Sequence, residues 1–144
     1  MSTDRLARAA ADAMWAQDTA SRALGMAITE IAPGAATLTM PVSDTMVNGH
    51  GLCHGGYIFM LADSAFAFAC NSHNQRAVAQ HCAITFLSPG RLGDVLTARC
   101  CEVSRAERSG VYDVRVTRQD DEVIAVFRGL SRTVKGTLVL ETGV

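Results

Sequence analysis

The sequence lacks most of the features that mark a specialised class of protein. It has no internal repeat, and its 3 prolines and 12 glycines form no linker-like tract. Its 13 Lys and Arg nearly balance 14 Asp and Glu, so we expect no nucleic-acid partner of the broadly basic kind. The 144 residues are enough for one domain, 1–144, and too few for a TIM barrel.

Signals for disulfides and for secretion are also missing. The cysteine count is odd and no C-x-x-C pair occurs, so a reducing compartment fits best and we expect a cytoplasmic protein. The cysteines are Cys53, Cys70, Cys82, Cys100 and Cys101. The first 18 residues contain acids and no uninterrupted apolar segment, so we expect no secretory signal.

The longest apolar segment is too short to be a membrane anchor. It covers residues 55–70 and has Asp63 at its centre. A membrane-spanning helix needs about 20 apolar residues. The segment therefore predicts a buried helix, and we expect no membrane partner.

Residue patterns predict two helices and six strands. In the N-terminal segment 1–25 they predict a helix over 4–24, with Asp4 as its N-cap and Gly25 directly after its end. Strands are predicted over 26–31, 36–42, 78–87, 94–104, 110–119 and 122–134. A turn-rich loop over 43–54 precedes the apolar helix, 55–71, and residues 137–144 are expected to form a loose tail.

These elements predict an α+β fold. A helix that is apolar on nearly every side must be covered all round. Strands that follow one another through short turns form an antiparallel sheet, and such a sheet can wrap around the helix. Pairing between two chains would protect the exposed edges of the sheet.

Asp63 is the first candidate for chemistry. Its neighbours one turn away on the predicted helix, including Phe59 and Ala67, are apolar, and a charge in such a place is costly unless it has a partner. The structural alternative is that Asp63 caps a loop or pairs with an arginine. The functional reading is a carboxylate at the floor of a pocket or at a subunit interface.

Gly55 and Gly56 are the second candidate. At a helix start they leave backbone N–H groups approachable at the positive end of the helix dipole, where they can hold an oxyanion. A tight turn that needs glycine is the alternative. Asp63 follows Gly55 by eight residues, about 12 Å along a helix axis. One helix cannot present both groups to one substrate, so we expect a homodimer in which Gly55 of one chain faces Asp63 of the other.

The loop before the helix offers Asn48, His50, Cys53 and His54. Asn48 could donate to the same carbonyl oxygen, or it could simply form a turn before Gly49. The two histidines and Cys53 lie in a glycine-broken loop with no further ligand cluster, so we expect no metal. A nucleophilic pair of Cys53 with a histidine is disfavoured because adjacent side chains seldom point at each other.

The segment from Asn48 to Ala67, N-G-H-G-x-C-H-G-G-x-I-F-x-L-A-D-x-A-F-A, closely resembles the central motif of the hotdog-fold acyl-CoA thioesterases. Within that family it is similar to the branch that acts on aryl-acetyl-CoA in phenylacetate breakdown. The resemblance extends to 69–72, 86–90 and 127–129 and covers the chain from about Trp15 to Gly136.

The resemblance implies a role for each matching residue. Asp63 would be nucleophile or general base, the Gly55 amide would polarise the thioester carbonyl, and Asn48 would assist it. It also implies a dimer with one continuous sheet and a tetramer formed from two dimers. We expect substrate contacts from His54, Gly56, Phe59, Ser64, Arg91 and Arg128, with the arginines near the phosphates of CoA.

The chain departs from the family pattern at the residues that position water. Some relatives have Thr where this chain has Ala67, and others have Ser on the following strand where it has Ala79. His81, Thr85 or Ser64 are the candidates to replace them.

The function we predict is hydrolysis of phenylacetyl-CoA and hydroxyphenylacetyl-CoA thioesters to free acid and CoA, without a cofactor. The alternatives are a hotdog dehydratase acting on β-hydroxyacyl thioesters and a non-enzymatic protein that binds acyl-CoA.

Overall fold

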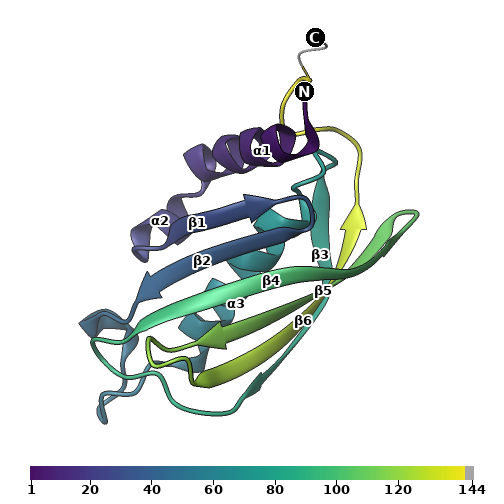
Figure 1. The fold of residues 1–144 in the computed structure, drawn as a ribbon. Helices are drawn as coiled ribbons and strands as arrows, with labels where there is room; N and C mark the ends of the chain where they lie inside the picture. The colour runs from purple at the N-terminus through teal and green to yellow at the C-terminus, as the bar shows by residue number, and fades with distance from the viewer. Residues whose placement is uncertain (142–144) are drawn as a thin grey trace.

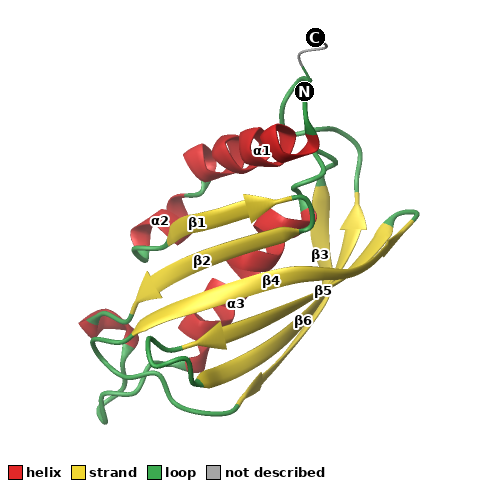
Figure 2. Cartoon of the chain, in the orientation of Figure 1, coloured by secondary structure: helices red, strands yellow, loops and turns green. Residues whose placement is uncertain are grey.

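Alternating side chains and short turns fold most of the chain into one antiparallel sheet around a central helix (Figures 1 and 2). The structure, a computed structural model, describes residues 1–141. The helices are α1 (Thr3–Gln17), α2 (Thr19–Ala23) and α3 (Gly55–Cys70), with a 3-10 turn, η1, at Asp44–Met46. The strands are β1 (Ala27–Ala32), β2 (Ala35–Pro41), β3 (Ala77–Phe86), β4 (Val95–Ala106), β5 (Ser109–Thr117) and β6 (Val123–Thr133).

The predicted strands and the predicted central helix are confirmed to within two residues at nearly every end. The strand order is β1-β2-β4-β5-β6-β3, and every neighbouring pair is antiparallel. β3 therefore crosses over to pair with β6 instead of β4. It forms one edge of the sheet and β1 forms the other (Figure 1).

Helix α3 lies against the inner face of the sheet and forms the centre of the core. Leu61, Ala62 and Ala65 have no exposed surface, and Phe66 is 1% exposed. The Phe66 ring lies so close to Gly129 on β6 that a Cβ there would be 2.8 Å from it. Close packing of this kind explains why an apolar helix with little amphipathic character is stable inside the sheet.

The N-terminal segment differs from the predicted single helix. It breaks at Asp18, whose side chain accepts a hydrogen bond from Ser21 N (2.9 Å) and starts the short helix α2. Ser2, not Asp4, is the N-cap of α1, and it accepts from Arg5 N at 3.2 Å. Gly25 follows the end of α2 with φ +74°, as predicted for a residue just after a helix. The break lets α2 turn toward α3.

The expected loose tail, 137–144, is corrected where the structure describes it. Asn74 accepts hydrogen bonds from Leu138 N and Val139 N, both 3.0 Å, and donates to Val139 O at 2.9 Å. Residues 142–144 lie outside the described part. None of the helices in residues 1–141 is long and apolar enough to cross a membrane.

Candidate active site

The loop before α3 is built around Asn48. Its side-chain oxygen accepts hydrogen bonds from His50 N (2.9 Å) and Leu52 N (3.1 Å), so the turn role expected of an Asn before a Gly is present. Because the oxygen is used in the turn, the amide N–H groups of Asn48 are left to donate elsewhere. Cys53 N donates to Gly90 O at 2.8 Å, which fixes the end of the loop beside the β3–β4 connection.

Gly55 and Gly56 begin α3, and His54 is the N-cap without a side-chain capping bond. Within residues 1–141 neither glycine N–H has a hydrogen-bond acceptor, as expected for the first turn of a helix. Gly56 is exposed and His54 is exposed. The start of α3 therefore presents free N–H donors at the positive end of the helix dipole.

A hollow of about 480 Å³ opens beside Gly55. It is lined by Cys53, Gly55, Ile58, Phe86, Leu87, Ser88 and Pro89, none of which is charged. Phe86, at the end of β3, covers the glycine: a Cβ on Gly55 would lie 2.8 Å from Phe86 Cζ. A side chain at position 55 would require the Phe86 ring or the helix start to move, which is a steric reason for glycine in addition to its free N–H.

Asp63 lies two turns further along α3 and is half-buried. In the part of the chain that the structure describes, its carboxylate has neither a hydrogen bond nor an ion pair, so the alternative of a loop cap or an arginine partner does not hold within one chain. Desolvation raises the pKa of Asp63 above its ordinary value of 3.8. The negative charge of Asp63 also contributes to raising the pKa of Cys82 on β3 and of Cys70 at the end of α3, although desolvation is the larger cause in both.

Helix α3 fixes the distance between the Gly55 N–H and the Asp63 carboxylate within one chain. Both lie on α3, eight residues apart, which separates Gly55 from Asp63 by about 12 Å along the axis. A reacting carbonyl must lie about 3 Å from both the nucleophile and the oxyanion donors. One chain alone does not bring Asp63 and Gly55 to the same atom.

The other expected substrate contacts are distributed unevenly. Phe59 is half-buried one turn before Asp63 and packs edge-on against Phe127, with ring centroids 5.4 Å apart. Arg91 is exposed, and its backbone forms an isolated antiparallel β-bridge with Leu52 in the loop that precedes α3. Phe59 and Arg91 are therefore placed near the site.

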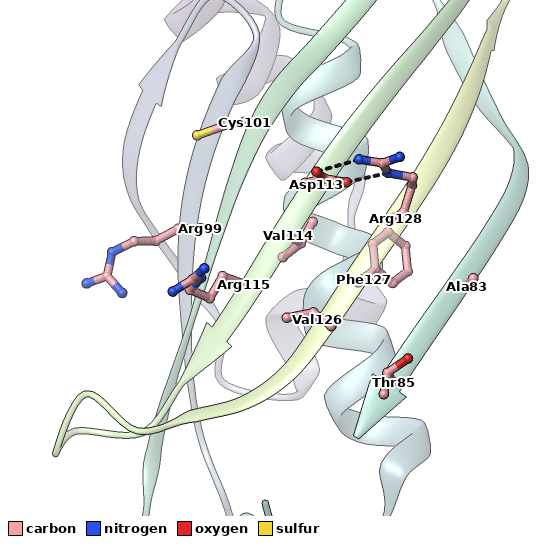
Figure 3. A pocket seen from close by; sticks show the side chains of 10 residues that line it. All are labelled: Ala83, Thr85, Arg99, Cys101, Asp113, Val114, Arg115, Val126, Phe127 and Arg128. Atoms are coloured by element: carbon pink, nitrogen blue, oxygen red, sulfur yellow. Dashed lines mark hydrogen bonds and ion pairs between the residues drawn. The ribbon is translucent and has the colours of Figure 1, made fainter. Parts of the chain in front are cut away.

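Ser64 and Arg128 are placed away from it. Ser64 is 5% exposed and shares a hydrogen bond of 2.9 Å with Ser21 Oγ on α2, so the expected substrate contact is corrected to a structural role. Arg128 projects from the outer face of the sheet, opposite to α3, and is bound to Asp113 (Figure 3). β6 carries it there because side chains alternate along a strand.

The candidates for positioning water are reduced in the same way. Thr85 lies on the outer face of β3 and lines the same hollow as Arg128 (Figure 3). The Ser64 hydroxyl is hydrogen-bonded to the Ser21 hydroxyl. His81 is two residues before Ala83 on β3, after the register irregularity between Ala79 and His81, and therefore lies on the same outer face as Thr85. Within one chain none of the three candidate side chains is placed beside the Asp63 carboxylate.

The loop before α3 suggests two other kinds of chemistry: a metal site and a nucleophilic Cys53 thiol. No three His, Cys, Asp or Glu side chains within residues 1–141 gather closely enough to hold a metal ion. Burial raises the pKa of Cys53 to about 11, so its thiol is protonated at neutral pH and is a poor nucleophile.

Sequence reasoning gave Phe86 and Leu87 no role in the site. Phe86 is the last residue of β3 and Leu87 follows it. Both are large and apolar, and Phe86 is 50% exposed and Leu87 57% exposed. Their position after a strand looked like an ordinary strand end. Two signals were present: the resemblance over 86–90, and two adjacent apolar residues before a turn, where one would be expected to face solvent.

Comparison with known proteins places the chain in a family. Residues 50–125 match the model of the thioesterase superfamily, which is more than half of the chain. The acyl-coenzyme A thioesterase PaaI of Escherichia coli (strain K12) is 45% identical over 131 residues, covering 91% of this chain and 94% of that protein. This chain belongs to the thioesterase superfamily.

Solved structures agree. The structure of the E. coli PaaI protein from the phenylacetic acid degradation operon matches with a TM-score of 0.93 and 44% identity, covering 94% of this chain and 99% of that one. The smu.793 protein of Streptococcus mutans UA159, bound to acetyl CoA, matches with a TM-score of 0.75 and 28% identity over 78% of this chain and 90% of that one. The predicted α+β hotdog fold is confirmed.

Proposed function

We propose that this protein hydrolyses acyl-CoA thioesters and that aryl-acetyl-CoA esters are its substrates. The observation that carries the proposal is a carboxylate without a partner on the same apolar helix as a glycine-opened N-terminus, in a chain of the thioesterase superfamily. The relatives support the substrate, because one is named an acyl-coenzyme A thioesterase and another is bound to acetyl CoA. The five free cysteines support a cytoplasmic location.

The reaction follows from the groups at the two ends of the site. The Gly55 N–H, assisted by the Asn48 amide, donates to the thioester oxygen and stabilises the negative charge that develops there. Asp63 attacks the carbonyl carbon, or removes a proton from a water that attacks it. The C–S bond then breaks and the CoA thiolate leaves and takes up a proton. If water attacked, the acyl group leaves directly as the free acid; if Asp63 attacked, a water then hydrolyses the mixed anhydride, which releases the acid and restores the Asp63 carboxylate. A carboxylate with a raised pKa is a stronger base than an ordinary one, which suits either role.

The active unit in this proposal is a homodimer. β3 is an edge strand ten residues long, and the charge of Asp63 contributes to raising the pKa of Cys82 on that strand. Antiparallel pairing of two β3 strands would satisfy the open N–H and C=O groups and set the two α3 helices side by side in opposite directions. Gly55 of each chain would then lie opposite Asp63 of the other, and further pairing of dimers would give a tetramer.

The hollow beside Gly55 supports an aryl substrate. Its walls are uncharged, and the Phe86 ring lies over Gly55, where the thioester carbonyl would be held. An aromatic acyl group next to that carbonyl could pack against Phe86. Arg91, near the loop, is the residue we assign to the phosphates of CoA, and His54 and Gly56 border the entrance.

The decisive experiment measures thiol release from a panel of acyl-CoAs with wild type and Asp63→Asn. We expect phenylacetyl-CoA to be among the best substrates and the variant to lose about a hundredfold or more in kcat, the scale of one acid–base or nucleophilic group. Circular dichroism checks that the variant is folded. Undiminished turnover by a folded Asp63→Asn protein would refute the assignment.

The shared site has its own test, which mixes two inactive variants. Asp63→Asn and Gly55→Ala subunits are unfolded together, refolded and compared with each variant refolded alone. Random pairing gives about half heterodimers, each with one intact site, so roughly a quarter of wild-type activity should return. Sites contained within single chains would give no recovery.

A further inference from the structure

The outer face of the sheet, turned away from α3, has a second hollow of about 590 Å³. It is formed by β3, β4, β5 and β6, and its charged side chains are Arg99, Asp113, Arg115 and Arg128 (Figure 3). Val126, 39% exposed, lies among them. The hollow is thus separated from the Gly55 site by the thickness of the sheet.

The only carboxylate that lines this hollow is already used. Asp113 accepts two hydrogen bonds from Arg128, from Nε at 2.6 Å and from Nη2 at 2.8 Å, in the bidentate geometry of a strong guanidinium–carboxylate pair (Figure 3). Since this pair is neutral, the charge of the hollow is set by the two other arginines. They give it two positive charges on a chain whose net charge is −1.

Arg99 and Arg115 lie on the same face of the sheet. They are register partners on β4 and β5, and both are exposed. Arg99 donates to the Thr117 hydroxyl at 3.2 Å, and neither guanidinium has a carboxylate partner within residues 1–141. Like charges directly opposite each other on neighbouring strands destabilise a sheet.

A β-bulge creates this arrangement. The β4–β5 register shifts between Glu102 and Ser104. Without the shift, the pairing of Ala106 with Ser109 would continue and place Arg99 opposite Val116. The bulge thus brings two cations together on one face, an unfavourable pairing that an anion between them would relieve.

We propose that this hollow binds the phosphoryl groups of a nucleotide-type ligand through Arg99 and Arg115. Two guanidinium groups on neighbouring strands can each donate two hydrogen bonds to phosphate oxygens. Val126 is the register partner of Arg115 on β6 and gives an apolar contact suited to a base or ribose, and Thr85, paired with Val126 on β3, adds a hydroxyl group. The proposal is independent of thioester hydrolysis, because it concerns the opposite face of the sheet.

The test is calorimetric titration at low salt with inorganic pyrophosphate and with adenosine 3′,5′-bisphosphate. We expect both to bind wild type, with an affinity that falls as salt is added. Arg99→Gln/Arg115→Gln should lose at least about tenfold in affinity, because the charge-assisted hydrogen bonds are gone. Arg5→Gln/Arg105→Gln is the matched control: it removes the same charge from exposed arginines outside the hollow and should bind as wild type. Asp63→Asn should also bind as wild type, whether or not that variant is active.

Absence of binding to wild type, or equal affinity of wild type and Arg99→Gln/Arg115→Gln, would overturn the proposal. Kinetics separate two sources of the ligand once binding is found. If the nucleotide end of the substrate itself occupies the hollow, the double variant raises KM for an acyl-CoA and leaves KM for the matching acyl-pantetheine unchanged. If a separate nucleotide binds, both KM values stay at the wild-type level while pyrophosphate binding is lost.

Discussion

The hollow beside Gly55 and the hollow on the outer face of the sheet are lined by different kinds of residue. The hollow beside Gly55 has no charged lining residue; its polar groups are backbone N–H groups of a helix. The outer hollow is lined by three arginines and one aspartate. Apolar surroundings strengthen the few electrostatic interactions that act on a reacting carbonyl. Exposed guanidinium groups suit recognition of phosphate, where charge matters more than exclusion of water.

The carboxylates Asp63 and Asp113 also differ in their surroundings. Asp63 stands alone on an apolar helix, and desolvation raises its pKa. Asp113 is held by Arg128, and the hydrogen bonds from that guanidinium lower the pKa of Asp113. Asp63, which has no partner within residues 1–141, is the carboxylate we propose to be reactive, whereas Asp113 is engaged by Arg128. Substitutions in one hollow should therefore leave the other intact.

The largest effect after loss of Asp63 itself is expected from Gly55→Ala. The new Cβ would lie 2.8 Å from the Phe86 ring, so either the ring or the helix start must move. We expect the helix start to move, which displaces the N–H donor. We expect kcat for phenylacetyl-CoA to fall about a hundredfold, the effect of losing one oxyanion donor. Pyrophosphate binding in the outer hollow should not change.

Gly49→Ala is the matched control for this change. Gly49 lies in the same loop region, and a Cβ there meets no atom within 4 Å. The Gly49→Ala variant should keep kcat for phenylacetyl-CoA within a few-fold of wild type. Removing the obstacle in Gly55→Ala/Phe86→Ala should restore part of the rate if displacement is the cause. Wild-type kcat in Gly55→Ala would show that the Phe86 ring moves aside without displacing the N–H donor, and would contradict the expected displacement.

A smaller effect, on stability alone, is expected from Ser64→Ala. The substitution leaves the buried Ser21 hydroxyl without its 2.9 Å partner, which costs about 1–3 kcal/mol of unfolding free energy. Denaturant unfolding measures this loss, and Ser21→Ala should lose a similar amount. KM for phenylacetyl-CoA should stay unchanged in both, whereas a raised KM in Ser64→Ala alone would mean that Ser64 contacts substrate after all.

Ser64 also shows what the sequence could and could not predict. Strands, turns and the central helix were predictable because alternation and turn residues act locally, and the glycine pair and Asp63 stood out as polar exceptions in an apolar helix. A helix that is apolar on every side does not reveal which face meets the N-terminal segment. That Ser64 meets Ser21 depends on the break at Asp18, which a pattern of good helix formers concealed.

The outer hollow could not be predicted for a related reason. Arg99 and Arg115 each look like exposed residues on alternating strands, and their pairing depends on the bulge between Glu102 and Ser104. A bulge shifts the register by one residue, and a register is a property of two strands together. The same limit applies to Phe86, whose contact with Gly55 joins the end of β3 to the start of α3.

The smallest expected effect is a difference between Asp63→Asn and Asp113→Asn in how the free energy of unfolding depends on pH. The pKa of Asp63 is higher in the folded than in the unfolded chain, so folding favours its protonated form. Wild-type stability is then lost as pH rises from about 3.8 through the raised pKa. Asp63→Asn should be more stable than wild type at pH 7, and the difference should vanish in acid.

Asp113→Asn should behave in the opposite way. Hydrogen bonds from Arg128 lower the folded-state pKa of Asp113, so its stabilisation is present above 3.8 and is lost as pH falls through the lowered pKa. This variant should be slightly less stable than wild type at pH 7, by a small margin because the pair is exposed, and equal to it near pH 2. Thermal unfolding of the three proteins between pH 7 and about pH 2 measures both trends. Parallel curves for the two variants would mean that both carboxylates sit in equivalent environments, and Asp63 would then have no electrostatic reason to be the reactive one.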